Sequence, residues 1–153
     1  MKRRPLLPAD ATSDFSVRTV VVDDSPIMLT LLTQTLRRAG KFDIVGTATD
    51  GCRALREVSA LSPELVLMDF HLPQLNGIQV TQYLKESEHP PIVIIITSDE
   101  SSFARSMAEQ AGADGFLVKA ADLSFRLVRM LQDLFGSGDA RRLAAQVAQD
   151  CAT

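Results

Sequence analysis

The chain has 153 residues, which is enough for one ordinary domain and too few for two of comfortable size. Its net charge of −3, without a long run of either sign, argues against nucleic acid as the main partner, because phosphate binding favours a basic surface. Cys52 and Cys151 form no CxxC pair, and the longest apolar run, "PPIVIII", is far shorter than a membrane span. We therefore expect a cytoplasmic protein that binds neither nucleic acid nor a membrane directly.

Regular alternation of strands and helices begins at Val17, after residues 1–16, which we expect to form a flexible N-terminal arm. The sequence predicts five strands: Val17–Asp23, Ile44–Thr49, "ELVLMD" ending at Asp69, "IVIIIT" ending at Thr97, and "GFLVK" ending at Lys119. The first three predicted helices run from Pro26 to Ala39, onward from the turn at Asp50-Gly51, and from Asn76-Gly77 to about Glu86. Apolar residues at helical spacing predict the last two, from Ala104 to Ala111 and from Leu123 to Leu134.

Five β–α units in succession predict an α/β fold. Strands that are separated by helices of this length must be parallel, with right-handed crossovers. The mostly apolar strands favour a doubly wound (βα)5 sandwich with helices on both faces of the sheet, over residues 17–135. Residues 136–153 are predicted to be a linker and a short amphipathic sixth helix, because Leu143, Val147 and Cys151 recur every four residues.

Polar residues stand where four of the five predicted strands end. Asp23-Asp24, Asp69, Thr97 and Lys119 occupy the carboxyl ends of strands one, three, four and five. Ligands of open parallel sheets bind at that edge, so we expect these side chains to share one crevice. Three crowded carboxylates repel unless a cation intervenes, and oxygen-only ligands suit Mg²⁺. A metal, a lysine and a hydroxyl fit a transferring phosphoryl group, and Asp69 is the best candidate for its acceptor.

Ordinary structural roles are the alternatives for each of these residues. Asp23 and Asp24 could cap the first helix. Asp69 could be a strand-end turn residue, Thr97 a residue favoured in strands, and Lys119 a solvated side chain. The combination at matching strand ends, rather than any single residue, favours the functional interpretation.

The motifs resemble the CheY-like receiver domain of two-component response regulators over roughly residues 17–135. They are "VVVDDS" at 20–25, "GTATDGCRAL" at 46–55, "LVLMDFHLPQLNG" at 65–77, "IIITS" at 94–98 and "GADGFLVKA" at 112–120. The resemblance implies strand order 2-1-3-4-5 and a phosphoryl group accepted on Asp69. It also implies Mg²⁺ held by Asp23, Asp24, Asp69 and the main-chain carbonyl of His71.

The same resemblance assigns the remaining residues. Thr97 and Lys119 would contact phosphoryl oxygens, and Phe116 would be the aromatic switch that rotates inward when Thr97 moves. Two departures from the family pattern stand out: Ala120 replaces the usual proline after the lysine, and Phe116 lacks the hydroxyl of the tyrosine often found there. His71 and Asp99 border the path of an attacking water, so we expect them to tune the phosphoryl lifetime.

The resulting functional hypothesis is a phosphorylation-dependent signalling switch rather than an enzyme. A sensor histidine kinase or phosphotransfer protein would donate the phosphoryl group, and a changed face of fourth helix, fifth strand and fifth helix would act on a downstream effector protein. Pairing of two copies as a homodimer stays open. The alternatives are a phosphorylation-independent interaction module with a receiver fold, and a phosphatase, which would want an acid where His71 stands.

Overall fold

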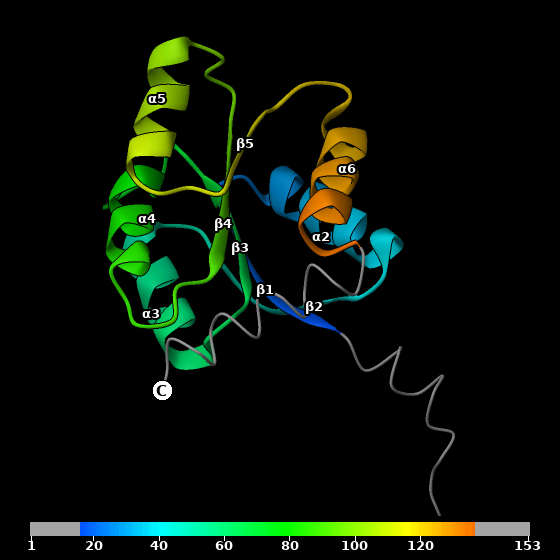
Figure 1. The fold of residues 1–153 in the computed structure, drawn as a ribbon, viewed down its shortest axis with the longest axis horizontal. Coiled ribbons are helices and arrows are strands. Elements are labelled where there is room, and N and C mark those ends of the chain that lie inside the picture. The colour runs from blue at the N-terminus through cyan, green and yellow to red at the C-terminus, as the bar shows by residue number, and fades with distance from the viewer. Residues whose placement is uncertain (1–15, 137–153) are drawn as a thin grey trace, which may run out of the picture.

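The computed structural model describes residues 16–136 as a five-stranded sheet with helices on both faces (Figure 1). The strands are β1 (Val17–Val22), β2 (Phe42–Ala48), β3 (Leu65–Asp69), β4 (Ile92–Thr97) and β5 (Gly115–Val118). The helices are α2 (Pro26–Ala39), α3 (Gly51–Leu61), α4 (Gly77–Lys85), α5 (Ser102–Gln110) and α6 (Leu123–Phe135). Every strand pair is parallel and the order is β2-β1-β3-β4-β5. The predicted doubly wound (βα)5 fold is confirmed, while the predicted arm and sixth helix lie outside the described residues.

Two apolar clusters, one on each face of the sheet, hold the layers together. Helices α3, α4 and α5 pack on one face and α2 and α6 on the other, as Figure 1 shows. Val20 and Val22 of β1 face the first cluster, whereas Val17 and Val21 face the second. All five residues of β3 are buried, which explains why its sequence is apolar without alternation. None of the helices within residues 16–136 is long and apolar enough to span a membrane.

Several predicted element boundaries were wrong by one or two residues. β1 ends at Val22 and β5 at Val118, so Asp23 and Lys119 lie just beyond the ladder. β2 begins at Phe42 instead of Ile44, because the chain turns sharply at Gly40 and Lys41, which both have positive φ. β2 also ends at Ala48 rather than Thr49, and α4 ends at Lys85, one residue before Glu86. As an edge strand, β2 is only partly buried, so its ends carry a weak apolar signal.

Short polar side chains start the helices that follow the sheet's carboxyl edge. The Ser25 hydroxyl accepts a hydrogen bond from the Met28 N–H at 3.3 Å, at the first turn of α2. Asp50 caps α3 in the same manner, and Asn76 forms a capping box with Gln79 at the start of α4. These caps satisfy N–H groups that have no partner within the helix, and they fix the loops after the strands.

Candidate functional site

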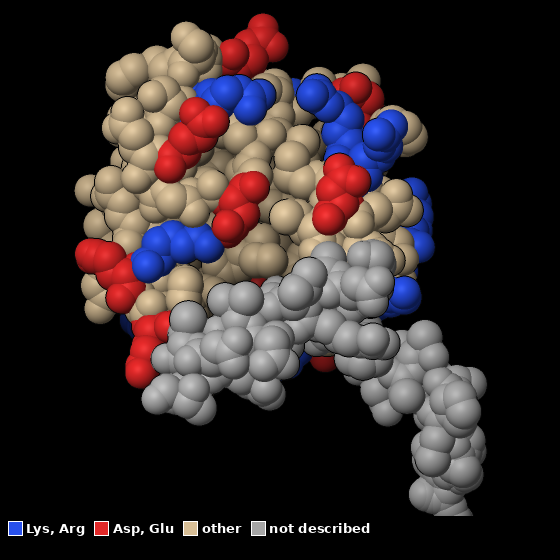
Figure 2. All heavy atoms as spheres, viewed as in Figure 1, with Lys and Arg blue, Asp and Glu red and all other residues tan. Residues whose placement is uncertain are grey.

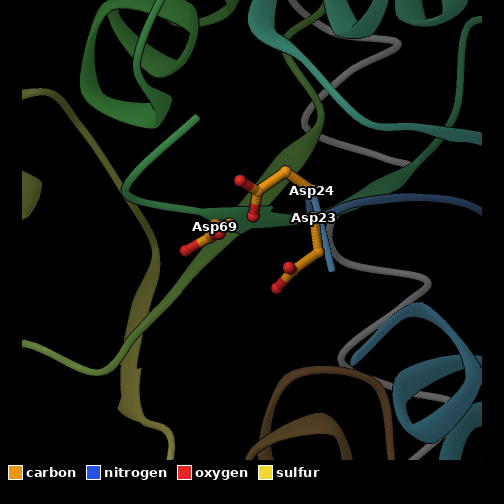
Figure 3. Close-up of side chains that lie close together, drawn as sticks. All are labelled: Asp23, Asp24 and Asp69. Carbon is orange, nitrogen blue, oxygen red and sulfur yellow. The ribbon is translucent and has the colours of Figure 1, made fainter. Parts of the chain in front are cut away.

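Strand register brings the predicted site residues to one edge of the sheet. The β1–β3 ladder pairs Val22 with Met68, so Asp23 and Asp69 follow paired residues. The β4–β5 ladder pairs Thr97 with Val118, which places Lys119 one residue beyond Thr97's partner. Figure 3 shows Asp23, Asp24 and Asp69 gathered where β1 and β3 end. The structure therefore brings together the three acids that the sequence predicted to meet.

The three carboxylates form a compact cluster with one side open to water. One oxygen from each lies within 4.8 Å of the others. Asp23 is fully buried and Asp69 is 4% exposed, whereas Asp24 is exposed. The Asp23 Oδ1 accepts a hydrogen bond from the Ser25 N–H at 2.9 Å, which orients this carboxylate. The site thus combines two buried acids with a third carboxylate that is exposed to water.

Lys119 contributes a positive charge to this cluster. Its Nζ lies 2.9 Å from Asp23 Oδ2 and 3.4 Å from Asp69 Oδ1. The first contact is an ion pair rather than a hydrogen bond. Asp23 Oδ2 is buried, and it accepts no hydrogen bond from the described residues. Every peptide bond of residues 16–136 is trans, including Lys119–Ala120. Lys119 reaches both acids although the usual proline is absent.

The pKa values of these groups reflect their crowding. Burial and the neighbouring charge of Asp23 raise the pKa of Asp69 above its ordinary value, against the opposing effects of Lys119 and the His71 N–H. Burial alone would lower the pKa of Lys119, but its close ion pairs with Asp23 and Asp69 together outweigh burial and raise it. The lysine therefore remains an ammonium, and its charge does not fully compensate the buried acids.

The cluster fits a small divalent cation. All its donors are oxygens, which hard cations prefer, and the buried Asp23 Oδ2 lacks a proper hydrogen bond within the described chain. Three side chains leave further coordination positions for water, which suits Mg²⁺ better than a full Ca²⁺ cage. His71 is exposed, and its N–H donates to Asp69 Oδ1 at 3.4 Å. The role predicted for the His71 carbonyl stays a prediction.

Thr97 ends β4 and is fully buried. Its Oγ1 accepts a hydrogen bond from the Asp99 N–H at 3.1 Å, so its own hydrogen remains free to donate. The Asp99 carboxylate accepts from the Ser101 N–H at 3.0 Å, and its hydrogen bonds with Ser101 lower the pKa of Asp99. Asp99 thereby ties the loop after β4 to the start of α5. Its predicted influence on phosphoryl lifetime stays a prediction.

Phe116 lies inside the domain in this structure, with 8% of its surface exposed. The guanidinium carbon of Arg105 on α5 stands 4.8 Å from the centroid of its ring, a cation–π contact. The predicted switch ring therefore occupies an inward position, held by a residue that the sequence analysis did not single out. No sequence motif marks Arg105, because the contact depends on how α5 crosses β5.

Gly77 is a second residue whose importance the sequence reasoning missed. A Cβ at this position would collide with the main-chain carbonyl of Asp69. The Gly77 N–H also donates to the Phe70 carbonyl at 2.8 Å, which closes the loop after β3. The sequence "NG" signalled only a turn, whereas the structure shows that this glycine lets the start of α4 approach Asp69.

Comparisons with known proteins identify response regulators. The family model described as the response regulator receiver domain matches residues 19–132. The response regulator GacA of Pseudomonas viridiflava is 33% identical over 137 residues, which cover 89% of this chain and 62% of that protein. The transcriptional regulatory protein NarL of Mycobacterium tuberculosis is 35% identical over 103 residues, which cover 67% of this chain and 48% of that protein.

Solved structures agree with the sequence comparisons. The signal receiver domain of NarL from Mycobacterium tuberculosis has a TM-score of 0.73 and 31% identity, covering 80% of this chain and 98% of that one. The chain spans about half the length of the curated relatives it matches. The likeness therefore concerns the receiver part of these longer regulators.

Proposed function

This chain belongs to the response regulator receiver domain family, and we propose that it is a switch that accepts a phosphoryl group on Asp69. The observation that carries the proposal is the cluster of Asp23, Asp24 and Asp69 with Lys119, assembled from the ends of β1, β3 and β5. The acceptor must be a carboxylate that a phosphoryl donor can reach. Asp69 contacts Lys119 and lies within 4.8 Å of both other acids, one of which, Asp24, is exposed to solvent.

In the proposed reaction, an Asp69 oxygen attacks phosphorus, and the bond from phosphorus to the donor's histidine nitrogen breaks. Asp23, Asp24, Asp69 and the His71 carbonyl would hold Mg²⁺, and the ion would supply positive charge for the phosphoryl oxygens. Lys119, at 3.4 Å from Asp69, is placed to pair with a phosphoryl oxygen. The Asp23–Ser25 hydrogen bond holds the neighbouring carboxylate in position throughout. The chain's part is therefore positioning and charge compensation.

Signalling would follow from new partners for Thr97 and Lys119. A phosphoryl group adds about two negative charges and three acceptor oxygens beside them. The free hydrogen of the Thr97 hydroxyl can donate to one of these oxygens, which would pull on the loop that Asp99 anchors to α5. We propose that the change spreads over the face formed by α5, β5 and α6. Phe116 and Arg105 lie on this route.

The partners implied by this role are proteins. A sensor histidine kinase or a phosphotransfer protein would supply the phosphoryl group, and an effector protein, effector domain or second copy of the chain would read the altered face. Acidic and basic side chains are interspersed over the face of the domain seen in Figure 2. The proposed outcome is regulation of a partner, without turnover of a separate substrate.

Incubation with acetyl phosphate, with and without Mg²⁺, tests the proposal by intact mass. We expect the mass to rise by one phosphoryl group only when Mg²⁺ is present, and not at all in Asp69→Asn. Asp43→Asn, an exposed aspartate on β2, is the matched control and should be labelled normally. A protein that takes up no phosphoryl group from acetyl phosphate or a phosphohistidine donor would instead be an interaction module with a silent site.

A further inference from the structure

Arg105 is an exposed residue of α5 that contacts a buried ring. Its guanidinium carbon stands 4.8 Å from the centroid of the Phe116 ring on β5, and only 8% of Phe116 is exposed. A guanidinium within about 6 Å of an aromatic ring is attracted by the negative charge of the ring face. Among the described residues, Arg105 forms no ion pair with a carboxylate. The ring is therefore the partner of its charge in this part of the chain.

The ring that Arg105 contacts shares a face of the sheet with Thr97. The β4–β5 ladder pairs Phe116 with Ile95, and both side chains belong to the apolar cluster on the face covered by α3, α4 and α5. Thr97 follows Ile95 by two residues on β4, so its side chain points to the same face. Phe116 and Thr97 are therefore neighbours on adjacent strands, and Thr97 carries the hydroxyl that is free to donate to a phosphoryl group.

A chain of hydrogen bonds leads from Thr97 to the main chain of Arg105. The Asp99 N–H donates to Thr97 Oγ1 at 3.1 Å, and Asp99 Oδ1 accepts from the Ser101 N–H at 3.0 Å. The Ser101 carbonyl in turn accepts from the Arg105 N–H at 3.3 Å, and the Ser101 hydroxyl caps α5 by accepting from the Ala104 N–H at 3.1 Å. These bonds fix the first turn of α5 to the end of β4. Arg105 is thus connected to Thr97 through the loop as well as through the ring it contacts.

We propose that Arg105 is a positioning residue that holds the Phe116 ring inward before any phosphoryl group is bound. The inference rests on the proposed phosphorylation of Asp69, because it concerns the ring position that phosphorylation is expected to select. A ring that is already inward leaves less conformational change for phosphorylation to bring about. A cation–π contact at an exposed site shifts an equilibrium between two conformers about two- to fivefold. Arg105 thereby sets the fraction of unphosphorylated chains in which the ring points inward.

The charge of Arg105, rather than the packing of its methylene groups, supplies this effect. Long cationic side chains also cover apolar surface with their stems, so the two contributions must be separated. Arg105→Gln removes the charge and keeps most of the stem, whereas Arg105→Lys keeps a cation that can lie over the ring. By reciprocity, a charge that favours the inward ring also favours binding of a phosphoryl group, by the same factor.

A single-tyrosine form of the full chain tests the proposal. The chain has no tryptophan and one tyrosine, Tyr83, so Tyr83→Phe combined with Phe116→Tyr leaves one fluorophore, at position 116. Quenching of its fluorescence by acrylamide measures how accessible the ring is. Arg105→Gln and Arg105→Lys are compared in this parent protein, and Arg38→Ala, which removes an exposed arginine near the end of α2, is the matched control. Should the added hydroxyl unfold the domain, fluorine NMR of the chain labelled with fluorophenylalanine follows the native ring, whose signal is the one lost in Phe116→Leu.

Without Mg²⁺ we expect quenching to be about two- to fivefold stronger in Arg105→Gln than in the parent, and unchanged in Arg105→Lys and Arg38→Ala. Mg²⁺ with beryllofluoride, a phosphoryl mimic, should return Arg105→Gln to the parental value and leave the parent almost unchanged.

Equal quenching in Arg105→Gln and the parent would overturn the proposal. A large fall in the parental quenching on addition of beryllofluoride would also overturn it, because the ring would then point outward at rest. The intact-mass assay with acetyl phosphate separates the two levels of the argument. If Asp69 is labelled, either of these quenching results removes only the role of Arg105, whereas absence of labelling overturns the proposed function and this inference with it.

Discussion

Replacing Asp69 by asparagine should stabilise the metal-free protein. At an effective dielectric constant of about 20, the carboxylate of Asp69 is repelled by that of Asp23, at most 4.8 Å away, by at least about 3.5 kcal/mol. Lys119, at 3.4 Å, attracts Asp69 by about 5 kcal/mol on the same scale. Because these two interactions largely offset each other, the cost of burying the Asp69 charge decides the sign.

The raised pKa of Asp69 shows that the charged form is disfavoured in the folded state. A buried charge that is incompletely compensated costs on the order of 1 kcal/mol or more, which corresponds to roughly 3 °C in Tm for a chain of this length. The unfolded carboxyl titrates near its ordinary value of 3.8, whereas the folded one titrates higher. The wild type therefore loses stability relative to Asp69→Asn as the pH rises from 3.8 through the folded pKa, and the difference vanishes below 3.8.

Thermal unfolding of both proteins in a chelator, at neutral and at acidic pH, measures this difference, with Asp43→Asn as the control for the chemical change. Saturating Mg²⁺ should then reverse the order, because ligand at about 100 times its Kd stabilises the native wild type by about 2.7 kcal/mol and the variant has lost one ligand. A variant that is less stable than the wild type in chelator at neutral pH would refute the reasoning. It would mean that Lys119 more than compensates the buried acid.

Three further predictions concern residues around the acids. Gly77→Ala should lower the free energy of unfolding by about 1–3 kcal/mol in denaturant titrations, because the new methyl group meets the Asp69 carbonyl. In the control Gly46→Ala the methyl group meets only the flexible ends of Leu61 and Glu57, so the free energy of unfolding should fall clearly less. Arg105→Ala should lower the free energy of unfolding by about 0.5–1 kcal/mol, because the cation–π contact with Phe116 is lost. If Arg105→Ala lowers it equally in a Phe116→Leu background, the contact with the ring is not the cause. His71→Ala and Asp99→Ala should each change the decay rate of the Asp69 phosphoprotein, followed by intact mass; lifetimes equal to the wild type would remove both from the site.

The sequence was informative about the fold because its signals are local and repeated. Apolar runs such as "VVV" and "IVIII" mark strands buried on both faces, and Ser25, Asp50 and Asn76 mark helix starts. Boundaries were harder at β2, which lies at the edge of the sheet and is only partly buried, so burial imposes less apolar character on its ends.

By itself, the sequence determined which chemical groups stand at the carboxyl ends of the strands. Because parallel strands end at a common edge, it also determined that Asp23, Asp24, Asp69 and Lys119 would meet. Only the tertiary structure decided that Lys119 pairs with both Asp23 and Asp69 across a trans bond to Ala120, and that Gly77 leaves room beside Asp69. It also placed Arg105 over the buried ring of Phe116. These contacts join elements distant along the chain, and their distances depend on how helices and loops pack, which no local pattern of residues specifies.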